Sequence, residues 1–138
     1  MIDNDRLNHI IAVARLMKDN ADKLGLDKQE MFTLGMLHDV GYEFGESAEH
    51  HIKGYEMLKK QNYKYAKEVR YHGMPTSDYS SQALDLLNFA DMHINKKGEY
   101  VSFEDRLKDI ASRRGENSTA YINCKIIINN FKKRKFLE

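Results

Sequence analysis

The sequence lacks several features that would assign it to a common class of protein. Its single cysteine, Cys124, excludes an internal disulfide framework and fits a reducing compartment. No apolar run approaches the roughly 18 residues of a membrane span, and the polar N-terminus, MIDNDRLNHI, does not resemble a secretory signal. The formal net charge is only +1, so no strong field is directed at nucleic acid or a membrane surface. These absences predict a cytoplasmic globular protein without a membrane or nucleic-acid partner.

Proline and glycine are also scarce, at one and eight residues in 138, and alternating β-branched runs are few. Apolar residues instead recur at helical intervals over 7–24, and Gly25 follows as a stop. Asp27 and Glu30 form a capping box that opens a second helix, which runs to about Asp39. Further helices are expected from Ser47, over 63–72, over 81–93, from Ser102 to Gly115 and from Ser118 onward. The sequence therefore predicts an all-α protein, a compact single domain over 1–138 with about seven short helices.

Motifs of several common chemistries are missing, because there is no glycine-rich phosphate loop, no GxSxG nucleophile turn and no CxxC pair. Side chains that can bind metal ions are present on each of the first five predicted helices. They are His9, His38, Asp39, His50, His51, His72 and Asp91. This distribution suits a metal site in the core of a helical bundle, where facing helices each project a ligand inward.

The adjacent pair His38 and Asp39 has a chemical logic of its own. A carboxylate can bridge two ions, whereas an imidazole that coordinates through one nitrogen cannot. An aspartate beside a histidine is therefore a compact way to build a two-metal centre. Such centres polarise a phosphoryl oxygen and lower the pKa of bound water, which produces hydroxide near neutral pH.

These residues resemble a known signature. His9, the segment MLHD over 36–39 and the segment FAD over 89–91 are similar to the H…HD…D signature of the HD-domain metal-dependent phosphohydrolases. In the segment HHIKGYEML, His50 precedes a glycine by four residues, as in the HxxxG helix of that family, and VRYHG places His72 at a second extra histidine. The fuller pattern is similar to the bacterial subfamily that cleaves dinucleoside tetraphosphates at a di-iron centre.

The resemblance implies two divalent metal ions. One ion would be held by His9, His38, Asp39 and Asp91, with Asp39 bridging to a second ion completed by His50 and His72. A set of histidines and carboxylates suits first-row transition ions better than Mg²⁺, so we expect iron, with manganese or zinc as replacements. Neighbouring side chains on a helix point about 100° apart, so only one of His50 and His51 is expected to meet a metal. The HxxxG spacing favours His50, and His93 is expected to face elsewhere.

The resemblance also implies catalysis by Asp39 and His38, with Asp39 orienting a metal-activated water; Glu43 and Glu46 are candidates for proton transfer. Many relatives carry lysine where Tyr42 stands, so a basic phosphate contact is missing there. The candidate phosphate-binding residues are Lys96, Lys97 and Arg106.

The expected function is hydrolysis of a phosphoester or phosphoanhydride, in a nucleotide or dinucleoside polyphosphate. The alternative is a non-catalytic HD-fold sensor that binds metal and nucleotide. The expected partner is a small phosphate substrate, and a homodimer stays open.

Overall fold

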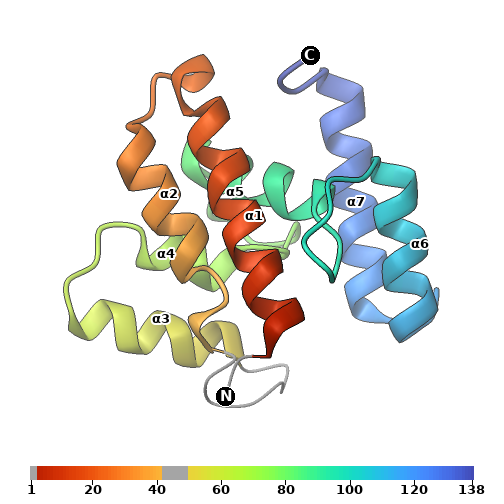
Figure 1. Cartoon of the computed structure of the whole chain (residues 1–138), viewed down its shortest axis with the longest axis horizontal. Coiled ribbons are helices and arrows are strands. Elements are labelled where there is room, and N and C mark those ends of the chain that lie inside the picture. The colour runs from red at the N-terminus through yellow and green to blue at the C-terminus, as the bar shows by residue number, and fades with distance from the viewer. Residues whose placement is uncertain (1–2, 42–49) are drawn as a thin grey trace.

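Helices account for the regular structure of the chain. The computed structural model describes residues 3–41 and 50–138, and the side chains of His50 and His51 lie outside the described part. Within these ranges the elements are α1 (Asn4–Asn20), a 3-10 helix η1 (Ala21–Leu24), α2 (Lys28–Leu37), α3 (His50–Lys60), α4 (Ala66–Tyr71), α5 (Gln82–His93), α6 (Phe103–Arg114) and α7 (Thr119–Arg134). The described ranges contain no β-strand beyond one isolated bridge. The all-α prediction is confirmed, and Figure 1 shows α6 and α7 side by side at one end of the molecule.

Polar caps start several helices where the sequence predicts them. The Asp27 side chain accepts a hydrogen bond of 2.8 Å from the backbone N–H of Glu30 and opens α2. Three serines begin later helices in the same way, each accepting from the backbone N–H three residues on: Ser81, Ser102 and Ser118. The predicted Ser47 cap lies outside the described residues.

The fourth helix is shorter than the sequence predicts. It was expected over 63–72, but α4 begins at Ala66. The reason is the end of α3, where the Tyr63 N–H donates to the carbonyl of Leu58 at 3.0 Å and Asn62 adopts a positive φ of 57°. These residues close α3, and the carbonyl of Tyr63 then accepts a hydrogen bond from the N–H of Ala66, where α4 begins.

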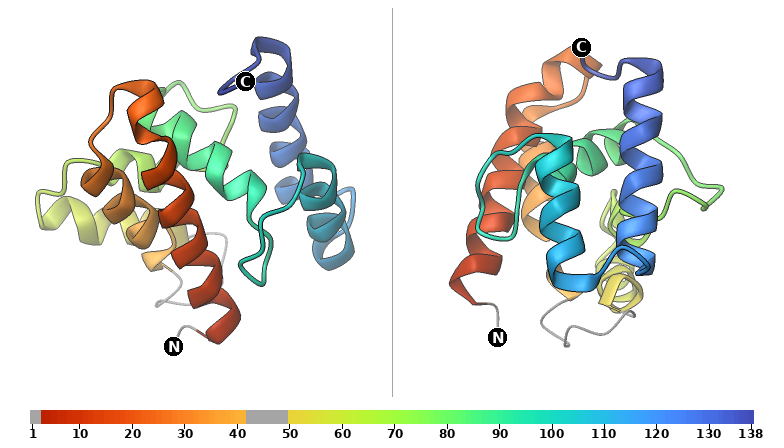
Figure 2. Two further views of the ribbon diagram at one scale, coloured as in Figure 1. Left: turned by 45° about the horizontal axis from the view of Figure 1, so that its top comes forward. Right: turned by 90° about the vertical axis from the view of Figure 1, so that its right-hand side faces the viewer.

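Two apolar clusters form the core, and α5 contributes to both. Leu86 and Leu87 belong to the larger cluster, with side chains of α1 to α4, whereas Met92 belongs to a smaller cluster with α6 and α7. Figure 2 shows α5 running between these two groups of helices. None of the helices in the described ranges is long and apolar enough to cross a membrane.

Close packing of α1 on α2 places the end of α2 in the interior. A Cβ atom at Gly35 would lie 2.4 Å from the Cα of Ala14, so only glycine permits this approach. His38 caps α2 directly afterwards and is 1% exposed.

Candidate metal centre

Three histidines and two aspartates from four helices meet in the interior. They are His9 on α1, His38 and Asp39 at the end of α2, His72 at the end of α4 and Asp91 on α5. Potential ligand atoms of His9, His38 and Asp39 lie within 4.8 Å of one another, and so do those of His38, His72 and Asp91. We call these five residues the His–Asp cluster. The sequence-predicted ligands are thus together, apart from His50, whose side chain lies outside the described residues.

The two oxygens of Asp39 face different histidines. Oδ2 lies 3.2 Å from Nε2 of His38 and 3.9 Å from Nε2 of His9, whereas Oδ1 lies 3.5 Å from Nε2 of His72. Asp91 approaches from α5, with Oδ1 at 2.8 Å from Nε2 of His9 and 3.8 Å from Nε2 of His38. A carboxylate whose oxygens serve separate nitrogens is suited to join two cations.

A backbone carbonyl fixes the orientation of each histidine ring. Nδ1 of His38, His72 and His9 lies 2.6, 2.6 and 2.9 Å from the carbonyl oxygens of Gly35, Val69 and Asn95, respectively. A carbonyl oxygen only accepts, so each Nδ1 carries a hydrogen and donates it. In the neutral ring, Nε2 then holds the lone pair, and it is Nε2 that faces the carboxylates. This is the arrangement that metal-binding histidines use.

The electrostatics of the cluster favour a cation. Nε2 of His38 is buried and has no hydrogen-bond partner among the described residues. Burial acts to lower the pKa of His38, but the carboxylates of Asp39 and Asp91 outweigh it and raise the pKa to about 10. Burial acts in turn to raise the pKa of both carboxyl groups, yet the neighbouring histidines hold it well below the usual range. A buried set of imidazole nitrogens and carboxylate oxygens fits a divalent transition ion.

The predicted phosphate-binding residues are divided by the structure. Lys96 and Arg106 line a pocket of about 90 Å³ beside His9. Nε of Arg106 donates to the backbone carbonyl of Asp91 at 3.0 Å, which ties the guanidinium to the cluster. Lys97 is exposed in the turn between α5 and α6 and is not among the residues that line this pocket.

Sequence reasoning did not identify three charged residues at the site. Arg6 places Nη1 3.2 Å from Oδ2 of Asp39, and its position one turn before His9 was a usable signal. Asp109 accepts hydrogen bonds from Arg106 and Arg113, and the spacing of four residues between Asp109 and Arg113 was a second signal.

His93 faces away from the cluster, as the sequence suggests. Its Nδ1 lies 2.7 Å from the carbonyl of Val101, and its ring stacks on those of Tyr100 and Phe103. Burial lowers the pKa of His93, which keeps the imidazole neutral in this aromatic group.

Comparison with known proteins identifies the family of the chain. The HD domain model matches residues 6–128. The chain belongs to the HD domain family. Ribonuclease Y of Mycoplasma capricolum subsp. capricolum and ribonuclease Y of Mycoplasma mycoides subsp. mycoides SC are each 40% identical to it over 58 residues, which is 41% of this chain. The chain spans only 11% of the length of these curated relatives. No solved structure gives a significant match.

Membership places the chain in a family of metal-dependent phosphohydrolases that bind divalent ions, and the His–Asp cluster could hold such an ion. The matches do not distinguish the dinucleoside tetraphosphate subfamily from other HD domains.

Proposed function

We propose that this chain is a metal-dependent hydrolase of a phosphoester or phosphoanhydride, with a nucleotide or dinucleoside polyphosphate as substrate. One observation carries the proposal: three histidine nitrogens converge on two buried carboxylates, and one of these nitrogens, Nε2 of His38, has no hydrogen-bond partner in the described part of the chain. His9, His38, Asp39, His72 and Asp91 would hold two divalent ions, iron by preference, with His50 as a further ligand. Such ions make water more acidic and polarise a phosphoryl oxygen.

The side chains around the cluster supply binding and orientation. Asp39 and His38, both buried, are the proposed catalytic pair, and Asp39 would align the attacking water. Arg106 and Lys96, from the pocket beside His9, would bind a phosphate group of the substrate, because guanidinium and ammonium groups stabilise the negative charge on its oxygens. Lys97 follows directly in the chain and stays a candidate for the same role. Glu43 and Glu46, the candidates for proton transfer, lie outside the described residues.

Turnover separates this proposal from its rival. A sensor that binds metal and nucleotide without cleaving it would keep the same cluster, so binding alone does not distinguish them. The ribonuclease Y likeness adds a third substrate type, the phosphodiester of RNA. It covers about a tenth of those proteins (11%), so their activity enters here as one substrate to be tested.

The experiment is a hydrolysis assay on protein purified from iron-replete cells, with Fe²⁺ or Mn²⁺ added. The panel contains nucleoside mono-, di- and triphosphates, a dinucleoside tetraphosphate, an aryl phosphate and a short RNA. We expect hydrolysis of a nucleotide by the wild type and its loss in His38→Gln, with the surface variant Asp22→Ala as the active control. No turnover with either ion would favour the sensor. Less than about half an equivalent of transition metal in fresh protein would contradict the metal centre itself.

A further inference from the structure

A basic pocket adjoins the His–Asp cluster. It has a volume of about 90 Å³ and is lined by Asp3, Arg6, His9, Lys96, Arg106 and Arg113. This limited space suits a small anion. His9 belongs both to the pocket and to the cluster, so an anion in the pocket would lie directly beside a phosphate at the cluster.

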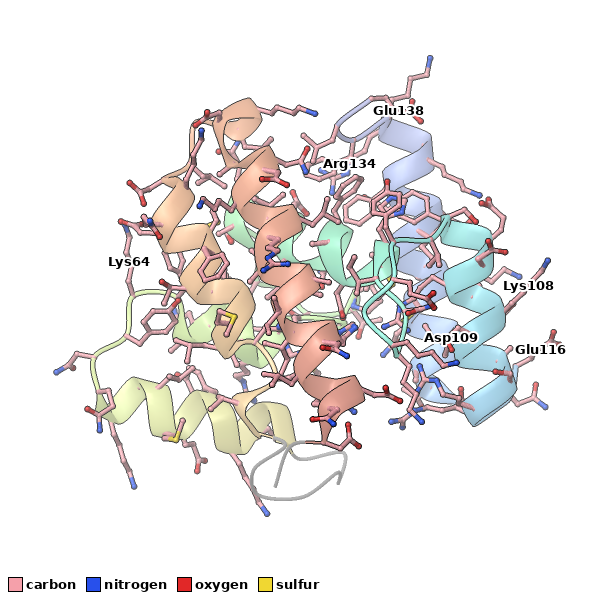
Figure 3. All side chains as sticks on the ribbon, in the orientation of Figure 1. Lys64, Lys108, Asp109, Glu116, Arg134 and Glu138 are labelled. Carbon is pink, nitrogen blue, oxygen red and sulfur yellow. The ribbon has the colours of Figure 1, made fainter. Side chains whose placement is uncertain are left out.

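Asp109 holds two of the pocket's arginines in place. Its Oδ2 accepts from Nη1 of Arg106 at 3.0 Å and from Nη2 of Arg113 at 3.3 Å. The same oxygen accepts from the backbone N–H of Lys96 at 3.3 Å, and Figure 3 shows Asp109 on the side of α6 that faces this turn. One carboxylate cannot neutralise two guanidinium groups, and each guanidinium has five N–H donors. Arg106 is also held by Asp91, through its backbone carbonyl at 3.0 Å and its carboxylate at 3.7 Å. Asp109 therefore positions both arginines, and positive charge and N–H donors remain for a ligand chiefly on Arg113.

Arg6 connects the pocket to the cluster. It lines the pocket, and its Nη1 lies 3.2 Å from Oδ2 of Asp39. With Lys96, Arg106 and Arg113 it brings four cationic side chains to the pocket. Arg106 also meets a cluster carboxylate, since its Nη2 lies 3.7 Å from Oδ1 of Asp91. Arg6 and Arg106 are therefore shared with the cluster. Lys96 and Arg113 form no ion pair with a cluster carboxylate in the described part of the chain, and these two cations fit a second phosphate next to the first.

We propose that this pocket binds the phosphate adjacent to the one attacked, and that it makes the chain select phosphoanhydrides over phosphate monoesters. The proposal rests on the proposed function for its reaction, in which a water oxygen bonds to the phosphorus at the cluster and the bond to the bridging oxygen breaks. The electron pair of that bond stays on the bridging oxygen, which departs with the phosphate in the pocket. Both water protons pass to the product phosphates and then to solvent. Arg106 and Arg113 stabilise the charge on the departing group.

The first test measures binding without turnover. Inorganic pyrophosphate is titrated by calorimetry into chelator-treated protein at low salt. Arg113→Gln should weaken the affinity about tenfold or more, the usual effect of removing one charged hydrogen-bond donor. Lys96→Gln, on the exposed turn, should weaken it in the same direction. The matched control is Lys108→Gln, which removes the same charge from α6 on the side away from Asp109 (Figure 3) and should leave the affinity unchanged.

The second test compares substrates. With Mn²⁺, Arg113→Gln should lower kcat/KM for a nucleoside diphosphate or dinucleoside polyphosphate about tenfold more than for an aryl phosphate. Equal losses on both substrates, or an unchanged pyrophosphate affinity in Arg113→Gln, would overturn the pocket assignment. Pyrophosphate binding that depends on Arg113, in a wild type that hydrolyses nothing, would instead overturn the proposed function and leave the anion pocket in place.

Discussion

The number of metal ions that Asp39 and His72 each help to bind can be measured by elemental analysis of variants. The two oxygens of Asp39 face different histidines, with His38 at 3.2 Å on one side and His72 at 3.5 Å on the other. Asp39→Ala should therefore remove both ions. His72→Ala removes a nitrogen that lies 3.5 Å from Oδ1 of Asp39, on the other oxygen from the one that faces His38, so we expect it to lose one ion and retain the other.

The same difference should appear in stability, because an ion that binds only the folded state stabilises it. At a free concentration 100 times its Kd, each ion adds about 2.7 kcal/mol to the free energy of unfolding, and two independent ions add about twice that. The difference between metal-loaded and chelated protein in urea unfolding should therefore be largest in the wild type, about half as large in His72→Ala and close to zero in Asp39→Ala.

The assay combines elemental analysis with these unfolding curves, and Asp22→Ala, which alters an exposed ion pair with Lys28, serves as the control that keeps both ions. Equal and partial metal loss in Asp39→Ala and His72→Ala would refute the bridging role. An Asp39→Ala protein that keeps one full equivalent would show that Asp39 serves a single ion.

Three further predictions address the cluster and its supports. In chelated protein the pKa of His38 is raised from 6.5 to about 10, so protonated His38 stabilises the folded state. This stabilisation is fully present below pH 6.5 and is lost as the pH rises through 10, so the urea midpoint should fall over this window. A midpoint that is constant or rises would contradict the assigned electrostatics. Gly35→Ala, whose Cβ would lie 2.4 Å from a main-chain atom of α1, should lower the free energy of unfolding by ~1–3 kcal/mol, whereas the exposed control Gln29→Ala should not; equal unfolding curves would argue against the tight helix crossing. His50→Ala should reduce occupancy of the second ion steeply, and His51→Ala should reduce turnover by ~10–100-fold at most; the reverse order would show that His51 is the ligand.

Sequence alone predicts the fold where local chemistry determines it. The caps at Asp27, Ser81, Ser102 and Ser118 act through hydrogen bonds to residues only three positions away, so they are visible in a single segment. The start of α4 cannot be predicted from a single segment in this way, because it depends on how the preceding helix, α3, ends.

The candidate site also contains residues that the sequence predicts and residues that it does not. His38 and Asp39 are adjacent in the chain, and their residue types indicate a metal site. Arg113 and Asp109 do not, since an arginine and an aspartate four residues apart are common on exposed helices. The place of Arg113 in the pocket with His9, and of Asp109 against Arg113 and Lys96, follows only from the packing of α6 and the turn that precedes it.

The hydrogen bonds from Nδ1 of the three cluster histidines to backbone carbonyls affect which substitutions would disturb the rings. The groups that orient the rings of His38 and His72 are main-chain carbonyls three residues earlier in their own helices, and the ring of His9 is oriented by the main chain of a turn. A main-chain oxygen is present whatever side chain the codon specifies. Substitutions at Val69 or Asn95 that preserve the local backbone would therefore leave the tautomers of the histidines unchanged. The orientation of the three rings therefore depends on the path of the backbone, whereas the side chains at these positions serve the fold, with Val69 in the core and Asn95 bonded within its turn.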